Sequence, residues 1–546
     1  MIATLLLCAV LQDSAPVTPP TPETSAPISA ADLAGHVRVL SSDAFGGRGP
    51  GQYGEEKTVA YMIDRFKAFG LEPAGTDGGW TQAVPMRELT PIQTPTASYD
   101  AGFGKQDLVF GRDVMVFSPA GTEPVALTDS PMVFAGYGIV APEFGWNDYE
   151  GIDVKGKTVV VLVNDPGYAS GDPALFRGNA MTYYGRWTYK YEEAARQGAA
   201  GCLIVHETGA AGYPWPVVVQ GWGRPQLYLA ADESAPAPSP IQGWLTDVAA
   251  ADLFKAGKHD FAGLVAAAQK PGARPTLLTS SFTSFAHNTS RDLASANIAA
   301  KIVGSEFPDE TVLVCAHWDH LGDTQDGTKD SIYNGAHDNA TGTAALLELA
   351  EALASAPTKP KRTILFLSIT AEEKGLLGSA YYARAPLVPV AKTVCGINID
   401  GLNSDGPMDD IVVVGYGASE LDADLALAAI AQGRTVSPEA TPEKGSYFRS
   451  DHFSLAKVGV PMLYTNAGTT STEHGAEWVS ERRGDYVANR YHRASDEYHS
   501  GWDLSGAADD VQLFHALLAR WASEPRWPAW APTSEFLAAR EASQGK

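Results

Sequence analysis

Apolar residues recur at helical spacing near the start of the chain. Five of them fall at i, i+3, i+4, i+7 and i+10, the repeat of one helix face: Val59, Met62, Ile63, Phe66 and Phe69. Gly70 follows directly, and glycine commonly stands just beyond the end of a helix. The pattern therefore predicts a helix over residues 55–69.

From about residue 282 onward, short apolar runs alternate with stretches of helical pattern. The apolar runs cover residues 311–315, 362–369 and 394–399, and the helical stretches cover residues 342–353 and 375–383. Strands that alternate with helices in this way form sheets with parallel strands and a layer of helices on each side. We therefore expect an α/β fold with a mixed, mostly parallel sheet and helices on both faces.

The middle of the chain has a different texture. Short β-branched runs at 133–136 and 158–163 are separated by Gly, Pro and Asp turns, and a helical stretch at 189–197 precedes an apolar run at 202–205. This pattern predicts a β-rich module inserted into the α/β domain. The expected organisation is a leader with a tether, the first part of the main domain, the insert, and the rest of the main domain: residues 1–28, 29–120, 121–275 and 276–546.

Residues 1–11 form an apolar run that is too short to cross a bilayer, which takes about 20 residues. The run resembles the hydrophobic part of a secretory signal, although the basic residues that usually precede it are missing. Residues 12–28 are rich in Pro, Thr and Ser, a composition typical of a disordered tether. We expect an exported protein, periplasmic or secreted, without stable membrane insertion.

Composition limits the partners and the covalent chemistry. With 546 residues, 45% apolar and 19% charged, the chain should fold into two domains or more. Its formal charge of −24 argues against nucleic acid as a partner, because phosphates require a basic surface. Cys202, Cys315 and Cys395 lie in apolar runs without Cys-x-x-Cys spacing, so we expect buried free thiols and no disulfide framework.

Imidazole and carboxylate residues recur where the expected strands end. Three such positions follow a strand directly and two more stand in loops: His317, Glu372 with Glu373, Asp400, Asp338 and His492. Open α/β sheets build their sites at the carboxyl ends of strands. Two imidazoles and three carboxylates can hold two zinc-like ions if one carboxylate bridges them, and Glu372 is then left to act as a general base.

Each of these residues also has an ordinary structural explanation when it is taken alone. Asp338 precedes a helix and could simply cap it, and Glu372 with Glu373 could be a solvated pair at a helix start. Their shared placement favours metal chemistry. Competing motifs are weaker: Gly-x-Ser-x-Gly and His-Glu-x-x-His are absent from the sequence, and the P-loop-like match at 151–158 precedes a strand instead of following one.

These motifs resemble those of the co-catalytic di-zinc exopeptidases, the family of the bacterial leucyl aminopeptidases and glutamate carboxypeptidase. The resemblance covers most of the chain and points to secreted bacterial members that carry a protease-associated (PA) insert. Residues 40–57 look like the family's N-terminal segment. Residues 134–142, 153–157 and 194–201 look like the insert.

The resemblance implies two zinc ions with a shared ligand: His317, Asp338 and Asp400 around one ion, and Asp338, Glu373 and His492 around the other. It also implies that Glu372 is the general base, that Asp319 orients His317, and that Tyr491 stabilises the oxyanion. Among the other histidines, His320 and His337 are expected to line the cleft without binding metal. His337 stands where many relatives carry an acidic residue.

The expected activity is that of a zinc-dependent metallo-exopeptidase that cleaves peptides by attack of a metal-bridged water. An aminopeptidase needs an acid for the substrate ammonium group, and a carboxypeptidase needs an arginine for the terminal carboxylate. Candidates for these roles are Asp405, Asp409, Asp410 and Asp451, and Arg449, Arg482 and Arg483. Aminopeptidase is the leading hypothesis. A carboxypeptidase of the glutamate carboxypeptidase type, a glutaminyl cyclase-like acyl transferase and a non-catalytic receptor-like binding protein are the alternatives, and the oligomeric state is left open.

Overall fold

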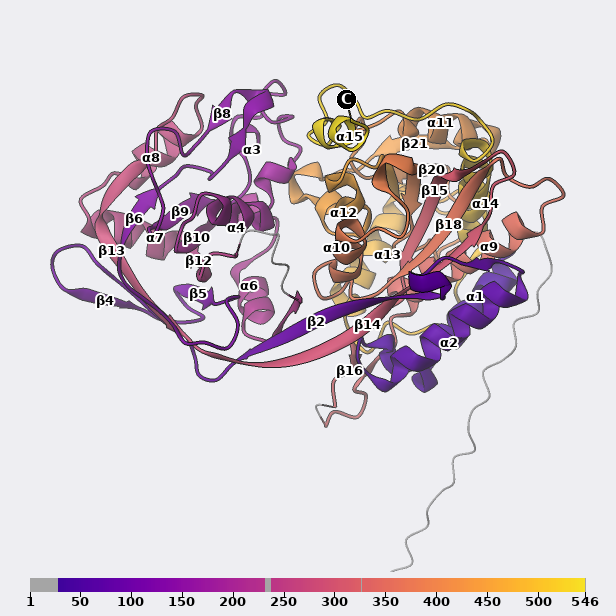
Figure 1. Ribbon diagram of the computed structural model, residues 1–546, viewed down its shortest axis with the longest axis horizontal. Helices are drawn as coiled ribbons and strands as arrows, with labels where there is room; N and C mark the ends of the chain where they lie inside the picture. The colour runs from indigo at the N-terminus through magenta and orange to yellow at the C-terminus, as the bar shows by residue number, and fades with distance from the viewer. Residues whose placement is uncertain (1–27, 231–236, 326, 546) are drawn as a thin grey trace, which may run out of the picture.

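The computed structural model describes residues 28–230, 237–325 and 327–545. Two large β-sheets, each with its own helices, lie side by side (Figure 1). Cys8, the apolar run at 1–11 and nearly all of the expected tether lie outside the described residues. Within the described part of the chain, no helix is both long and apolar enough to span a bilayer.

The larger sheet has a parallel centre and antiparallel flanks. The four central strands are β18, β15, β19 and β22, and all three pairings between them are parallel. On one side β14, β2 and β11 continue the sheet antiparallel, and on the other side β20 pairs antiparallel with β22 and parallel with β21. In order, the strands are β11 (Gln226–Leu229), β2 (Thr81–Pro91), β14 (Asn288–Ile302), β18 (Arg362–Ile369), β15 (Phe307–His317), β19 (Thr393–Asn398), β22 (Met462–Asn466), β20 (Asp410–Val413) and β21 (Thr435–Pro438), with β1 (Glu72–Pro73) on β14.

The expectation of a mixed α/β sheet is confirmed, but the parallel part is confined to the centre. The central strand β18 is buried along its whole length, as a parallel strand covered on both faces should be. By contrast, β14 has exposed residues over much of its first half. Antiparallel strands tolerate water on one face, so such a strand suits the flank of the sheet.

Helices cover both faces of the larger sheet because successive residues of its strands point in opposite directions. Val312 and Val314 join one core cluster, whereas Leu313 and Cys315 join another. The first cluster includes residues of α1 (Ala30–Leu40), α2 (Tyr53–Ala68), α9 (Thr341–Ala354), α11 (Leu421–Ala431) and α14 (Ser505–Trp521). The second includes residues of α10 (Leu377–Arg384) and α12 (His452–Lys457).

The helices and strands expected in the main domain are all present. The helices predicted at 55–69, 342–353 and 375–383 correspond to α2, α9 and α10. The predicted strand at 362–369 coincides with β18, and those at 311–315 and 394–399 fall on β15 and β19. Cys202, Cys315 and Cys395 are buried free thiols, as expected.

The smaller sheet includes strands from the segment 121–275, predicted as a β-rich insert, and also strands from outside those limits. Its strand order is β4 (Lys105–Leu108), β3 (Thr96–Asp100), β13 (Thr276–Ala286), β6 (Val125–Phe134), β9 (Thr158–Leu162), β10 (Gly201–His206), β12 (Ile241–Thr246) and β5 (Val114–Phe117). Strands β3, β4, β5 and β13 thus lie outside the predicted insert. Short strands such as β4, with three exposed residues of four, give little sequence signal of which sheet they will join.

Several helices accompany the smaller sheet, including α4 (Trp187–Arg196), α6 (Trp215–Trp222), α7 (Asp247–Ala256) and α8 (Phe261–Ala268). The long strands β2 and β14 run from the larger sheet toward the smaller one (Figure 1). The P-loop-like segment at 151–158 leads into strand β9, which begins at Thr158. A P-loop must open a helix, so the segment is an ordinary loop.

Candidate metal centre

The central parallel strands bring the predicted metal-binding residues to one edge of the larger sheet. His317 is the last residue of β15 and pairs in register with Ile369, the last residue of β18. Glu372 and Glu373 follow β18 in the chain, and Asp400 follows β19, whose Asn398 pairs with Cys315 of β15. Residues that are distant in sequence therefore meet because their strands are neighbours.

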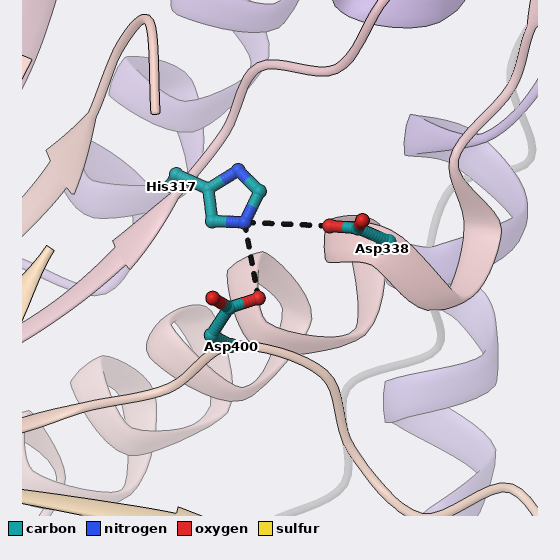
Figure 2. Close-up of side chains that lie close together, drawn as sticks. All are labelled: His317, Asp338 and Asp400. Carbon is teal, nitrogen blue, oxygen red and sulfur yellow. Dashed lines mark hydrogen bonds and ion pairs between the residues drawn. The ribbon is translucent and has the colours of Figure 1, made fainter. Parts of the chain in front are cut away.

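His317 lies between two carboxylates from different segments. Its Nε2 atom is 3.2 Å from Oδ1 of Asp400 and 3.4 Å from Oδ1 of Asp338 (Figure 2). The imidazole is almost fully buried. Ligand atoms of the three residues all lie within 4.8 Å of one another, close enough to surround one metal ion.

The second oxygen of Asp338 faces a different histidine. Nε2 of His492 lies 3.2 Å from Oδ2 of Asp338 and 3.1 Å from Oε2 of Glu373. His492 adopts a left-handed backbone conformation, with φ 56°, and its side chain is 36% exposed. The Asp338 carboxylate thus lies between two groups of ligand atoms, the arrangement that a bridging carboxylate requires.

The charges around this site favour a cation. Burial works against a charge on His317, but the carboxylates of Glu372 and Asp400 raise the pKa of its imidazole well above the usual value. Burial raises the pKa of Glu372 even though the charge of His317 opposes it, and Asp400 and Glu373 add to the rise. Divalent ions offset such crowded negative charge. Imidazole and carboxylate are also the donors that zinc prefers, so the residues fit two zinc-like ions.

His320 lies closer to this centre than the sequence indicated. Its Nδ1 atom is 2.6 Å from Oε1 of Glu373, and the ring is fully buried. Ligand atoms of His320, Asp338 and Glu373 lie within 4.8 Å of one another. Two imidazoles therefore adjoin Glu373, of which only His492 was predicted as a ligand. The sequence signal that could have identified His320 is its His-x-x-His spacing from His317.

Asp319 contacts the imidazole of His317 through its backbone oxygen more closely than through its carboxylate. Nδ1 of His317 lies 3.1 Å from the backbone oxygen of Asp319 and 3.8 Å from its carboxylate oxygen. The carboxylate instead accepts hydrogen bonds from the backbone N–H groups of Glu372 at 3.0 Å and Glu373 at 3.4 Å. Asp319 thus fixes the loop after β18, and its backbone is the nearer partner of the imidazole.

Asn339 ties the segments of the site together, a role that the sequence did not reveal. Its side-chain N–H donates to the carbonyl oxygens of Ile399 at 3.0 Å and His317 at 3.4 Å. Its side-chain oxygen accepts from the N–H groups of Gly342 at 2.9 Å and Gly401 at 2.8 Å. One amide therefore links the ends of β15 and β19 to the start of α9. The preceding peptide bond, Asp338–Asn339, is cis.

Two further buried residues hold the turn that carries Asp338. The Asp496 carboxylate accepts from the backbone N–H groups of His337 and Asp338, both at 3.1 Å. Arg48 donates to four backbone carbonyls, including those of Asn334 and Gly335 just before that turn. Neither residue was singled out from the sequence, because each acts through backbone atoms far away in the chain.

The residues considered for substrate binding are placed very differently. Tyr491 stacks on His492, with ring centroids 3.9 Å apart, and is 46% exposed. Asp451 is fully buried, and Asp410 is occupied by Thr469 and Thr470. Asp405 pairs with Arg482, which lines a cavity beside Asp400 together with Arg483. Arg449 is solvent-accessible and donates to the carbonyl oxygen of Lys444.

Comparison with known proteins matches residues 297–514 to the model of peptidase family M28. Leupeptin-inactivating enzyme 1 of Streptomyces exfoliatus is 31% identical over 174 residues, which are 31% of this chain and 38% of that protein. Aminopeptidase NAALADL1 of Mus musculus is 34% identical over 119 residues, 21% of this chain and 14% of that protein. The aligned regions thus span much less than two thirds of either relative.

Among solved structures, an aminopeptidase from Aneurinibacillus sp. strain AM-1 aligns over 90% of this chain and 94% of its own, with 19% identity and a TM-score of 0.46. The matched family region of the present chain runs from within β14 to within α14 and includes every residue of the candidate metal centre. Residues 297–514, which hold the proposed ligands, are thus similar to peptidase family M28.

Proposed function

We propose that this protein is a zinc-dependent exopeptidase that removes N-terminal residues from peptides. The observation that carries the proposal is the Asp338 carboxylate, whose two oxygens face His317 and His492 at 3.4 and 3.2 Å. His317, Asp338 and Asp400 would hold one zinc ion, and Asp338, Glu373 and His492 the other. The match of residues 297–514 to the model of peptidase family M28 supports this assignment.

The remaining residues would carry out the proton transfers. When bound, two zinc ions polarise the scissile carbonyl and lower the pKa of the attacking water. Glu372 is the carboxylate of the centre that is not needed as a ligand, so its proposed role is to accept a proton from the water and later deliver it to the leaving amine. The proposed role of Tyr491 is to donate a hydrogen bond to the oxyanion.

Removal of N-terminal residues is favoured over removal of C-terminal ones by the names of relatives. Two zinc ions would offset the charges of Asp338, Glu372, Glu373 and Asp400, so these carboxylates do not choose between an ammonium group and a carboxylate. The mouse relative named as an aminopeptidase agrees with this choice. The substrates would be peptides with a free amino terminus.

Two further expectations belong to this proposal. The apolar run at 1–11 supports export to the periplasm or the medium. The smaller sheet with its helices would be a protease-associated (PA) insert beside the peptidase domain, on the strength of the segments at 134–142, 153–157 and 194–201.

The proposal is tested on purified protein by zinc content and by hydrolysis of free, N-acetylated and C-amidated dipeptides. We expect about two zinc ions per chain, cleavage of the free and C-amidated peptides, and no cleavage of the N-acetylated ones. Chelation should abolish activity and zinc should restore it. Cleavage of N-acetylated dipeptides would show a carboxypeptidase instead, and protein without bound zinc or any turnover would point to a binding protein.

A further inference from the structure

A cavity opens directly beside the candidate metal centre, on the side of the Asp400 ligand. It has a volume of about 220 Å³, and its wall includes Asp400 and His337. The other lining residues come mainly from α13 (Gly475–Asn489) and from the loops that follow β19 and β22. Because a metal ligand forms part of the wall, a group held in this cavity would lie next to the reacting bond.

The size and lining of the cavity suit one amino-acid side chain. Its volume of about 220 Å³ leaves room for the side chain of one residue. Leu402, Met408, Val479 and Trp502 supply apolar contacts for the carbon atoms of a side chain. Ligand pockets typically combine such apolar walls with a few polar groups that fix orientation.

Three arginines of the α13 segment line the same cavity, and two of them are neutralised. Arg482 lies 2.7 Å from the carboxylate of Asp405, and Arg490 lies 2.6 Å from that of Asp485. Each of these pairs leaves little net charge for a ligand. Two further carboxylates line the cavity: Asp400, which is a proposed zinc ligand, and Asp496, which accepts from the backbone N–H groups of His337 and Asp338. The third arginine, Arg483, is thus the cation of the lining to examine.

Arg483 makes no ion pair with any residue that the structure describes. Its Nη2 atom donates to the backbone oxygens of Ala467 at 3.1 Å and Gly468 at 3.2 Å, and the side chain is exposed. Burial lowers the pKa of Arg483, and the negative charges of Asp410 and Asp405 act in the opposite direction. Asp410 is already bound by Thr469 and Thr470, and Asp405 by Arg482. One cation with free donor capacity therefore faces a cavity of side-chain size.

We propose that this cavity binds the acidic side chain of the substrate's N-terminal residue, so that the enzyme prefers N-terminal glutamate or aspartate, with Arg483 as the specificity-determining residue. The proposal rests on the proposed function, because it takes the neighbouring metal centre as the site of cleavage. A guanidinium group recognises a carboxylate by charge-assisted hydrogen bonds. It would repel a lysine side chain and gain less from a neutral amide.

The test compares N-terminal glutamate with its neutral isostere. We expect the zinc-loaded enzyme to hydrolyse glutamyl-7-amido-4-methylcoumarin with kcat/KM at least about tenfold above the glutaminyl compound, the lower range for a hydrogen bond between charged groups. Arg483→Met should reduce that ratio to about one, and Arg483→Lys should retain part of it. Arg112→Met, in the turn between β4 and β5, serves as the control and should leave the ratio unchanged.

Binding of the product separates this proposal from the peptidase assignment. Calorimetric titration of the zinc-loaded protein should show L-glutamate binding at least about tenfold more tightly than L-glutamine, and Arg483→Met should abolish the difference. If peptides are not cleaved but this preference holds, the activity is wrong and the pocket is right. If leucyl substrates are cleaved while the glutamyl to glutaminyl ratio is one or lower, the pocket assignment is overturned.

Discussion

Nδ1 of His320 lies 2.6 Å from Oε1 of Glu373, while Oε2 of the same carboxylate lies 3.1 Å from Nε2 of His492. The two oxygens of Glu373 thus face two different imidazoles. With one oxygen held by the buried His320, the other is fixed toward His492 and Asp338. Groups that orient a ligand in this way are part of a metal site even when they do not bind the metal.

Replacing His320 should therefore weaken one zinc site without removing it. We expect His320→Gln to bind two zinc ions. The site formed by Asp338, Glu373 and His492 should lose about 10–100-fold in affinity, the usual effect of removing a residue that orients a metal ligand. Competition with a coloured chelator measures both affinities. His492→Gln should bind only one ion, because it lacks a proposed ligand.

The control for this pair is His259→Gln in the segment after α7, which should bind zinc as the wild type does. If His320→Gln retained a single ion while His492→Gln retained two, the assignments of the two histidines would have to be exchanged. The comparison thus decides which imidazole beside Glu373 is the ligand.

Arg48 is a second residue whose loss should be measurable, in this case through stability. The side chain is fully buried and donates to the carbonyls of Leu40, Trp318, Asn334 and Gly335 at 2.7–2.8 Å. Burial lowers its pKa to about 10, so it stays charged at neutral pH. Trp318 follows His317 in the chain, Asn334 and Gly335 precede Asp338, and Leu40 ends α1, so the guanidinium group ties α1 to the loops of the site.

Arg48→Met leaves these buried carbonyl oxygens without a donor, and each orphaned group costs about 1–3 kcal/mol. We expect the zinc-free variant to lose about 3–5 kcal/mol of unfolding free energy in urea, after partial rearrangement of the loops. Arg38→Met, on the exposed side of α1, should change it by less than about 0.5 kcal/mol. A loss below about 1 kcal/mol for Arg48→Met would mean that water replaces the guanidinium group.

The main elements and the proposed ligands could be predicted because their signals are local. The buried run at 362–369 and the acids directly behind it mark a strand end, and the strand pairing then brings His317, Glu373 and Asp400 together. Arg48 and Asn339 could not be predicted, because their partners are backbone carbonyls and N–H groups supplied by distant segments. No residue pattern marks such acceptors.

The limits of the smaller sheet were missed for a related reason. Strand β3 pairs with β13 across more than 180 positions of sequence, as in the pair Ala97 and Ser284. The residue pattern of a short polar strand does not determine which of two sheets the strand joins. Only the pairing with a distant strand decides its place, and periodicity carries no information about partners.

Glu348 and His36 make the stability of the core depend on pH. Oε1 of Glu348 lies 3.6 Å from Nε2 of His36. Burial raises the pKa of Glu348 from 4.5 to about 8, and the charges of Asp32 and Glu351 add to the rise. Burial lowers the pKa of His36 from 6.5 to about 4, and Arg65 acts in the same direction.

The signs of the two effects differ. Between pH 4.5 and 8 the folded protein binds more protons at Glu348 than the unfolded chain does, so stability falls as the pH rises. Between pH 4 and 6.5 the unfolded chain binds more protons at His36, so stability rises. Of these two groups only Glu348 still has a large effect above pH 6.5, and its contribution to the unfolding free energy should fall by about 1–2 kcal/mol up to pH 8.

Urea unfolding of zinc-free protein at pH 6.5 and 8.0 measures this contribution as a difference between two proteins. Over that interval the wild type should lose about 1–2 kcal/mol more unfolding free energy than Glu348→Gln, because an amide does not titrate. The raised pKa values of His317 and His492 add the same pH dependence to both proteins. Glu473→Gln, whose side chain is 74% exposed, should keep the wild-type dependence. Equal slopes for wild type and Glu348→Gln would assign the pH dependence to other groups.

Glu372 should be required for turnover but not for zinc binding. Its backbone N–H is held by the Asp319 carboxylate at 3.0 Å, so the loop should keep its shape when the side chain becomes an amide. Glutamine cannot accept the proton of the attacking water, and loss of a general base typically costs about 10²–10⁴-fold in rate. We expect Glu372→Gln to bind two zinc ions with wild-type affinity and to lose at least about 100-fold in kcat, with KM nearly unchanged. Loss of zinc in this variant would make Glu372 a ligand, and near-normal kcat would transfer the role of base to another group.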